Sequence, residues 1–128
     1  MMPCEFMYVS SGAMASAPFM TKIFPDNLLL GKDLFVYLNP QTAAEMKLME
    51  GDRVLVGAAQ GKFKARIHLY EGVRPGILAV PEGFGHTGFD RFMQGKGSNV
   101  RDIVDVQSDP LSGLPLWWGT RVNVLKKI

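Results

Sequence analysis

The sequence is poor in the residues that catalytic and metal sites most often use. It has one cysteine, Cys4, and two histidines, His68 and His86, in 128 residues. One cysteine excludes an internal disulfide and cannot by itself make a zinc site, and Cys4 lies at a terminus that we expect to fray. No HExxH, CxxC or Walker motif occurs, and no pair of carboxylates is suited to acid–base chemistry. The chain alone therefore predicts no catalytic centre.

Long apolar runs and a strong net charge are also missing. No segment approaches the length of a membrane span, so we expect no direct membrane insertion. The net charge of +2 is too small for a general nucleic-acid binder. Residues 1–60 carry four basic and six acidic residues (net −2), whereas residues 61–128 carry ten and six (net +4). The second half thus favours an anion, although solvated charges without a binding role explain the same counts equally well.

Short segments rich in strand-forming residues recur along the chain. We expect extended structure at residues 6–9, 34–38, 53–57, 63–69, 77–80, 100–106 and 121–125. Asn39 is a good N-cap and Pro40 a good first residue for a short helix that ends near Leu48. The pattern predicts one mainly β domain over residues 1–128, a closed barrel of about six strands with one or two short helices, because closure removes exposed sheet edges.

A glycine-rich loop with aromatic residues, residues 81–99, is the leading candidate for a binding surface. Its glycines are at positions 83, 85, 88, 95 and 97, and its phenylalanines are at 84, 89 and 92. Long loops in small domains are usually functional or disordered, and the aromatic residues argue against disorder. His86 lies between two glycines, where its ring would either donate to a ligand oxygen or pack on Phe84.

Three other side chains carry specific expectations. His68 shares one side of the alternating 63–69 segment with Lys64 and Arg66, which predicts an exposed polar position. Trp117 and Trp118 are adjacent, so on an extended strand one ring would pack in the core while the other meets a neighbouring domain.

Several motifs, in chain order, resemble those of one known family. They are residues 38–44 (LNPQTAA), 50–56 (EGDRVLV), 71–76 (EGVRPG), 81–86 (PEGFGH), 109–113 (DPLSG) and 120–122 (TRV). This set is similar to the molybdopterin dinucleotide-binding domain, the C-terminal domain of the dimethyl sulfoxide reductase family of molybdenum and tungsten oxidoreductases. Each motif alone is weak, but their order and spacing together are specific.

The resemblance implies a double-psi β-barrel that binds the molybdopterin guanine dinucleotide cofactor. It implies that other domains or subunits hold most of the molybdenum or tungsten environment, so that this chain is part of an oxidoreductase but is not catalytic alone. It places cofactor contacts at Ser10, Ser11, Gly12, Ala13, Met14, Asn39, Thr42, Gly83, Phe84, Gly85, His86, Thr87 and Asn99. Asn39 serves equally well as a simple helix cap, and the two roles are compatible.

Within that family, residues 11–20 and 85–87 look closest to the molybdopterin-like subunit of menaquinone reductase complexes. Some of those subunits carry the scaffold without a metal. The alternative function is therefore a structural or protein-interaction barrel that retains the fold without the cofactor.

Overall fold

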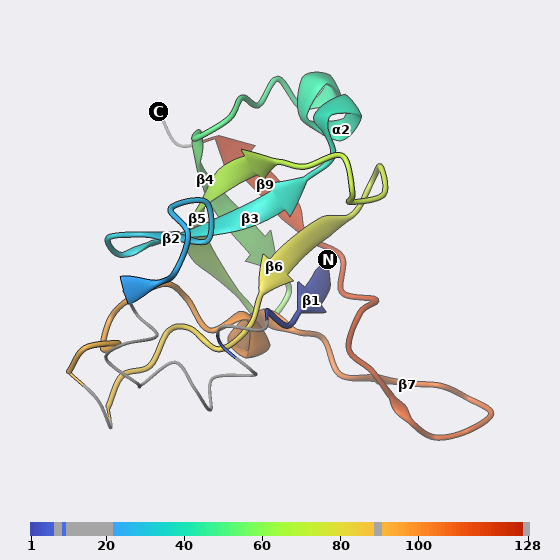
Figure 1. Cartoon of the computed structure of the whole chain (residues 1–128). Helices are drawn as coiled ribbons and strands as arrows, with labels where there is room; N and C mark the ends of the chain where they lie inside the picture. Colours follow the sequence, from blue (N-terminus) through green and yellow to red (C-terminus); the bar gives the residue numbers. More distant parts are fainter. Residues whose placement is uncertain (7–8, 10–21, 89–90, 127–128) are drawn as a thin grey trace.

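Nine short strands and two short helical segments make up the described part of the chain. The computed structural model describes residues 1–6, 9, 22–88 and 91–126 (Figure 1). The strands are β1 (Met2–Cys4), β2 (Leu29–Leu30), β3 (Asp33–Leu38), β4 (Arg53–Ala58), β5 (Gly61–Leu69), β6 (Leu78–Pro81), β7 (Gln107–Ser108), β8 (Pro115–Leu116) and β9 (Asn123–Lys126). The helical segments are α2 (Pro40–Glu45) and the 3-10 turn η2 (Val100–Ile103).

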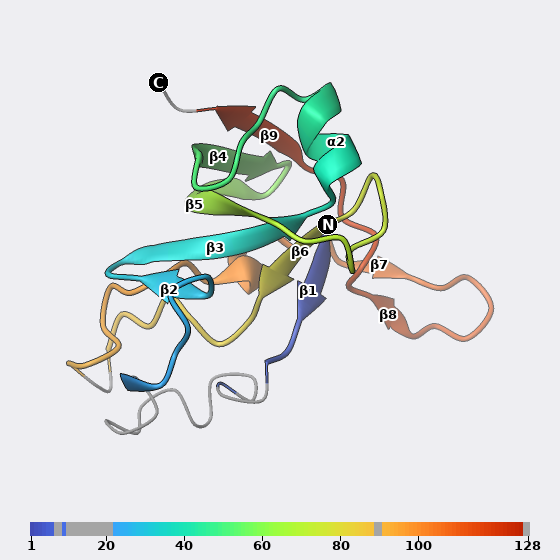
Figure 2. The same ribbon diagram turned by 45° about the horizontal axis from the view of Figure 1, so that its top comes forward.

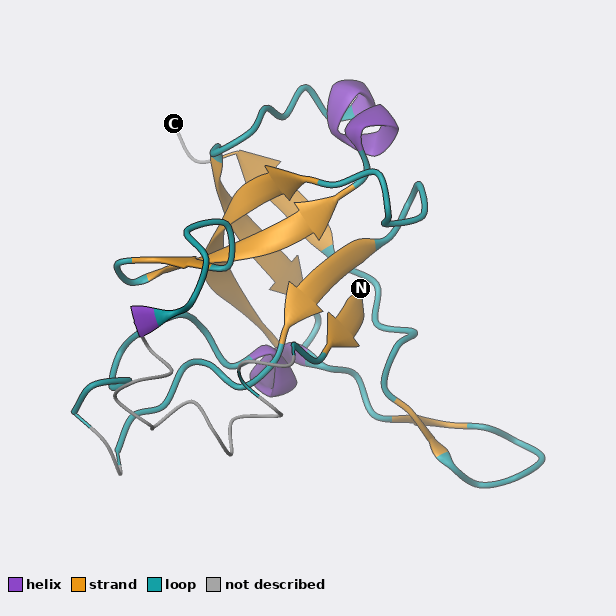
Figure 3. Ribbon diagram, in the orientation of Figure 1, coloured by secondary structure: helices purple, strands orange, loops and turns teal. Residues whose placement is uncertain are grey.

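The main sheet is mixed and has the strand order β1-β6-β3-β5-β4-β9, with β2 paired to β3. β1 is parallel to β6, and β3 is parallel to β5, whereas the β3–β6, β4–β5 and β4–β9 pairs are antiparallel. β7 and β8 form a separate two-stranded hairpin that projects away from this sheet (Figure 2). The fold is mainly β (Figure 3), and the extended segments predicted at residues 53–57 and 63–69 pair as the antiparallel hairpin β4–β5.

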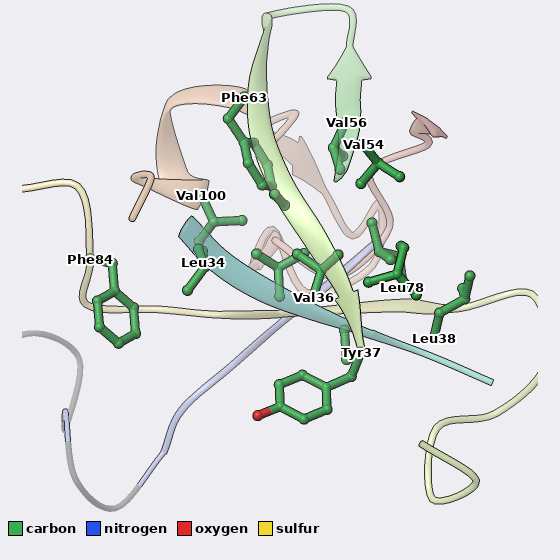
Figure 4. Packing of buried hydrophobic residues seen from close by; sticks show 14 of the residues in the cluster. Leu34, Val36, Tyr37, Leu38, Val54, Val56, Phe63, Leu78, Phe84 and Val100 are labelled. Atoms are coloured by element: carbon green, nitrogen blue, oxygen red, sulfur yellow. The ribbon is translucent and has the colours of Figure 1, made fainter. Parts of the chain in front are cut away.

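β3 lies in the middle of the core. Every residue from Leu34 to Leu38 is buried, as expected for a strand covered on both faces. On its neighbour β5, only the alternate residues Phe63, Ala65 and Ile67 are buried, which confirms the predicted one-sided pattern. Phe84 and Val100 pack near the Leu34 end of β3, at the opposite end from Leu38 (Figure 4).

The N-cap prediction at Asn39 is confirmed, but the helix is shorter than expected. The Asn39 side-chain oxygen accepts a hydrogen bond from the Gln41 backbone N–H at 2.9 Å, and Pro40 begins α2. The helix ends at Glu45 rather than near Leu48. Lys47 has φ 56°, a left-handed conformation that ends a helix.

Two predicted extended segments are wrong. Phe6 and Val9 lie outside any strand, although Phe6 stacks on Tyr37 and Val9 is fully buried. The first half of residues 100–106 forms η2 instead, because the Asn99 side chain accepts from the Arg101 N–H and caps a turn that buries Val100 and Ile103. Residues 7, 8 and 10–21 lie outside the described part of the chain.

The prediction that one of the two adjacent tryptophans packs in the core is also wrong. Trp117 is 41% exposed and Trp118 is 53% exposed. Their rings contact each other edge to face, with centroids 5.2 Å apart. Neither residue belongs to a long strand, so alternation of faces does not separate them.

We expected Cys4 to lie in a frayed terminus, and this expectation is wrong. Cys4 lies at the end of β1. β1 pairs in parallel with β6, and the Cys4 carbonyl accepts a hydrogen bond from the Glu82 N–H at 2.9 Å. Burial, followed by the nearby Glu82 carboxylate, raises the pKa of the Cys4 thiol from 9.0 to about 11. The thiolate is therefore scarce at neutral pH.

We predict that iodoacetamide alkylates Cys4 slowly in the folded protein. At pH 8 a thiol with a pKa of about 11 has roughly 100-fold less thiolate than one with its ordinary value of 9.0. Mass spectrometry of timed samples measures the rate, and the urea-unfolded chain is the control. Equal rates in the two states would show that β1 does not protect the thiol.

One carboxylate joins three strands of the sheet. Arg53 and Arg66 are cross-strand partners in β4 and β5, where two like charges would repel. Asp33 of β3 accepts from Arg66 Nε at 2.7 Å and from an Arg53 Nη at 3.3 Å. The hydrogen bond from Arg66 is the main reason that the pKa of Asp33 is lowered from 3.8.

We predict that Asp33→Asn lowers the free energy of unfolding at neutral pH. A carboxyl whose pKa is lowered by folding stabilises the protein above its unfolded pKa, and this contribution is lost as the pH falls through the folded pKa. The difference between wild type and variant should therefore be constant above about pH 5 and shrink below about pH 4. Urea unfolding at several pH values measures it, with the exposed Asp26→Asn as the control. A difference independent of pH would contradict the ion-pair account.

Candidate functional site

The candidate site is built from two chain segments that run beside each other after β6. Residues 83–88 leave the end of β6, and residues 94–99 return past them. The Gly85 N–H donates to the Lys96 carbonyl, and the Gly95 N–H donates to the His86 carbonyl, each at 2.9 Å. These backbone hydrogen bonds fix the loop in one arrangement.

Gly85 and Gly97 make this arrangement possible because both have positive φ, +83° and +67°. A Cβ on Gly85 would lie 2.2 Å from the Asn99 backbone nitrogen. A Cβ on Gly97 would lie 2.7 Å from Phe84 Cβ. Phe84 itself is only 3% exposed and packs edge to face against Phe24, so its ring belongs to the core that supports the loop.

Two hollows border the loop, with volumes of about 680 and 700 Å³. Both are lined by Gly85, His86, Thr87 and Asn99. Volumes of this size are typical of ligand sites. The structure therefore brings four of the predicted site residues together in one wall, with Gly83 and Phe84 beside them in the second hollow.

The first hollow carries positive charge that our sequence reasoning did not assign to the site. Lys62 and Lys64 on the exposed side of β5 line it, together with Ser98 and one acidic residue, Asp102. The alternation in residues 63–69 already predicted that the side chains of the even-numbered residues lie on the outer face of the strand. What the sequence did not show is that residues 94–99 cross beside that face, where Ser98 Oγ donates to the Lys64 carbonyl at 3.4 Å.

The second hollow contains an ion pair in which only the carboxylate is buried. Glu82 is 5% exposed, and its carboxylate accepts from an Nη of Arg101 at 2.8 Å. The Arg101 side chain is 62% exposed, so one Nη of its guanidinium binds Glu82 while much of the side chain faces solvent. Removing Arg101 would leave the Glu82 carboxylate buried without its cation, which destabilises the folded protein.

The side chains of His86 and Asn99 already have partners within the protein. His86 Nε2 lies 3.1 Å from the Gly83 carbonyl oxygen. The Asn99 side chain accepts from the Arg101 N–H and donates to the Asp102 carboxylate at 2.8 Å. By contrast, the backbone N–H groups of residues 86–88 donate to no other described residue. Backbone N–H groups of this kind are suited to donate hydrogen bonds to an anionic or carbonyl-rich ligand.

Asn39 and Thr42 lie away from this group, at the far end of β6. Asn39 Nδ2 donates to the Val73 carbonyl at 2.8 Å, and Thr42 Oγ1 accepts from the Gly76 N–H at 2.8 Å. β6 lies between these residues and Gly83, so the two groups lie at opposite ends of this 4-residue strand, which is about 10 Å long at about 3.3 Å per step (Figure 1). Ser10, Ser11, Gly12, Ala13 and Met14 lie outside the described residues.

The prediction that His68 is exposed is wrong, because its side chain is largely buried. Its Nδ1 lies 2.9 Å from a Glu50 carboxylate oxygen and its Nε2 lies 3.3 Å from Asn27 Nδ2. Its ring meets Phe35 and Tyr37 edge to face. These contacts explain the residue as part of the packing around β3.

The described part of the chain contains neither a metal-binding cluster nor a membrane-spanning helix. There, no three or more His, Cys, Asp or Glu side chains are grouped so as to hold a metal ion. Within the same residues, no helix has the length and apolarity needed to cross a bilayer.

Comparison with known proteins identifies the family. The family model described as "Molydopterin dinucleotide binding domain" matches residues 25–120, which include both segments of the candidate site. The chain belongs to this family. The resemblance drawn from the sequence motifs is confirmed.

Similar proteins are much longer than this molybdopterin dinucleotide-binding domain. It is 37% identical over 124 residues to the menaquinone reductase molybdopterin-binding-like subunit of Nitratidesulfovibrio vulgaris, covering 97% of this chain and 18% of that protein. It is 34% identical over 88 residues to a tetrathionate reductase subunit of Salmonella typhimurium, covering 66% of this chain and 8% of that protein. The chain thus spans less than a fifth of the length of these relatives.

A solved structure confirms the similarity of fold. Acetylene hydratase from Pelobacter acetylenicus superposes with a TM-score of 0.68 at 18% identity, over 99% of this chain and 18% of that one.

We predict that Gly85→Ala destabilises the domain by several times more than Gly95→Ala. Both glycines have positive φ, which costs alanine about 1 kcal/mol, but only at Gly85 would the new Cβ meet backbone atoms, while at Gly95 nothing lies within 4 Å. Urea unfolding of the two variants measures the difference. Equal losses would contradict the close approach of Gly85 to Asn99.

Proposed function

We propose that residues 83–88 and 94–99 of this domain bind the guanine dinucleotide form of molybdopterin, as one part of a molybdenum or tungsten oxidoreductase. The observation that carries the proposal is the wall formed by Gly85, His86, Thr87 and Asn99, which lines two hollows of about 700 Å³ in a chain of this family. The domain contributes binding and orientation, and the bound cofactor supplies the redox chemistry.

The chemistry of the wall suits the phosphates of a dinucleotide. Backbone N–H groups of residues 86–88 donate to no acceptor among the described residues, and a Cβ on Gly88 would meet no described atom within 4 Å apart from its chain neighbours. Lys62 and Lys64 add positive charge at the edge of the first hollow. Donors at a glycine-rich loop combined with nearby cations are a common arrangement for phosphate binding.

Asn39 and Thr42 belong to the proposal as a second group at the far end of β6. Their known hydrogen bonds fix the turn at residues 73–76 against the start of α2. An Asn side chain that makes one bond as acceptor and one as donor retains one further N–H and one lone pair, so the structural role leaves capacity for a ligand. Residues 10–14 complete the proposed set.

We further propose that the mixed sheet closes into a double-psi β-barrel of one domain. In support, the Met1 ammonium donates to the Thr120 carbonyl at 2.7 Å, which joins the start of β1 to the segment just before β9, the two ends of the strand order. One continuous hydrophobic cluster connects β3, β4, β5 and β6.

A titration with GDP tests the proposed contacts on the chain itself. We predict shifts of the backbone amide resonances of Gly12, Asn39, Gly85 and Asn99, followed by NMR. Lys62→Gln with Lys64→Gln should weaken binding by about two- to thirtyfold, since each of the two exposed ionic contacts contributes about 0.2–1 kcal/mol. Lys47→Gln, an exposed lysine beyond the end of α2, is the matched control and should leave affinity unchanged. Shifts confined to β9 and the residues after it would indicate non-specific anion attraction and contradict the proposal.

The alternative, a barrel without cofactor, is tested on the whole assembly. After oxidative release, mass spectrometry should find both pterin and guanine nucleotide. Their absence from the complete assembly would favour a structural or protein-interaction role.

A further inference from the structure

Five large apolar side chains that are exposed in the described part of the chain lie on or beside the hairpin of β7 and β8. We name residues 105–119 the β7–β8 arm. Its large apolar side chains are exposed to 82% at Val106, 95% at Leu111, 65% at Leu114, 41% at Trp117 and 53% at Trp118. The arm projects from the sheet in two views (Figures 1 and 2). Apolar residues gathered in this way on one element mark an interaction surface rather than scattered exposure.

The arm is also ordered before any partner binds. The Asp109 N–H donates to the Leu114 carbonyl at 2.9 Å, and the Gly113 N–H donates to the Asp109 carbonyl at 2.8 Å. The Asp109 carboxylate accepts from the Ser112 hydroxyl, and this hydrogen bond is the main cause of its lowered pKa. A preformed hairpin loses little conformational entropy on docking.

The base of the arm is fixed to the body of the domain. The Asp105 N–H donates to Thr120 Oγ1 at 2.9 Å, and Thr120 is only 3% exposed. The Thr120 carbonyl accepts from the Met1 ammonium. The direction in which the arm projects is therefore set by the core.

The charge of the arm indicates the chemistry of its partner. Between residues 105 and 119 there is no Lys or Arg, and the two acidic residues are Asp105 and Asp109. The Asp109 carboxylate is directed at its own turn. The tip therefore fits an apolar groove, and it lacks the basic residues that a nucleic acid or an anionic membrane surface would attract.

The relatives indicate where that groove lies. The family match ends at residue 120 and so includes the whole arm. In the relatives, the matched segments make up 18% and 8% of far longer proteins, so most of each relative's polypeptide lies outside the match. A second copy of this chain has no such support.

We propose that the β7–β8 arm docks its Leu111, Leu114 and Trp117 side chains into an apolar groove on another domain or subunit of the same molybdopterin oxidoreductase. The inference rests on the proposed function, because the partner is the remainder of that oxidoreductase. Aromatic and leucine anchors on a rigid support are typical of the centre of such interfaces.

Photo-crosslinking in the complete assembly tests this proposal. A benzoylphenylalanine replaces Leu114, and in a matched control it replaces Met49, which is equally exposed at 65% but lies beyond α2. We expect the Leu114 probe to crosslink to a molybdopterin oxidoreductase polypeptide outside residues 1–128, at a yield at least several-fold above the control. Crosslinks only to a second copy, only within residues 1–128, only to an unrelated protein, or none at all would overturn the proposal.

A double substitution, Trp117→Ser with Trp118→Ser, gives a second readout. Because both rings are exposed, the isolated variant should keep the wild-type melting temperature but lose association with the crosslinked polypeptide. Retained association would contradict a role for these side chains. Cofactor content measured on the same assembly separates the two proposals: cofactor without crosslinks refutes the arm alone, and crosslinks without cofactor refute the cofactor site alone.

Discussion

The rest of the structure depends on the burial of β3 on both of its faces and along both of its edges. β3 pairs in parallel with β5 and in antiparallel orientation with β6, so it fixes the positions of these two strands relative to each other. Because β6 runs opposite to β3, the segment after β6 emerges near the start of β3. The loop of residues 83–88 thus forms at the opposite end of the sheet from α2 (Figure 3). The position of the candidate site is a consequence of this pairing.

Backbone contacts, rather than ligand-ready side chains, define that site. Gly85 allows the chain to pass within contact distance of Asn99, and Gly97 allows it to pass Phe84. The side chains of His86 and Asn99 are used to hold the loop and to cap η2. What the loop offers a ligand is therefore its backbone N–H groups and open space, with cations supplied from β5. Such a surface suits a large phosphorylated cofactor better than it suits catalysis by the chain's own residues.

Local sequence patterns correctly predicted the elements that depend mainly on neighbouring residues in the chain. The alternation in residues 63–69, the Asn39-Pro40 cap and the apolar run of β3 all correspond to observed elements. The failures have tertiary causes. β1 forms because residues 2–4 pair with β6, a partner 77 residues away in register, and no pattern in the first ten residues shows this. The lysines beside the loop were visible as the outer face of a strand, but only the crossing of residues 94–99 over that face makes them part of a site. The family resemblance supplied the identity of the ligand, which the residue patterns alone did not name.

A structure of the complete assembly with its cofactor tests the central claim most directly. The account predicts density for a guanine dinucleotide with a phosphate oxygen within hydrogen-bonding distance of a backbone N–H of residues 86–88, and with Asn99 in contact. Cofactor density that touches neither residues 83–88 nor residues 94–99 would contradict it.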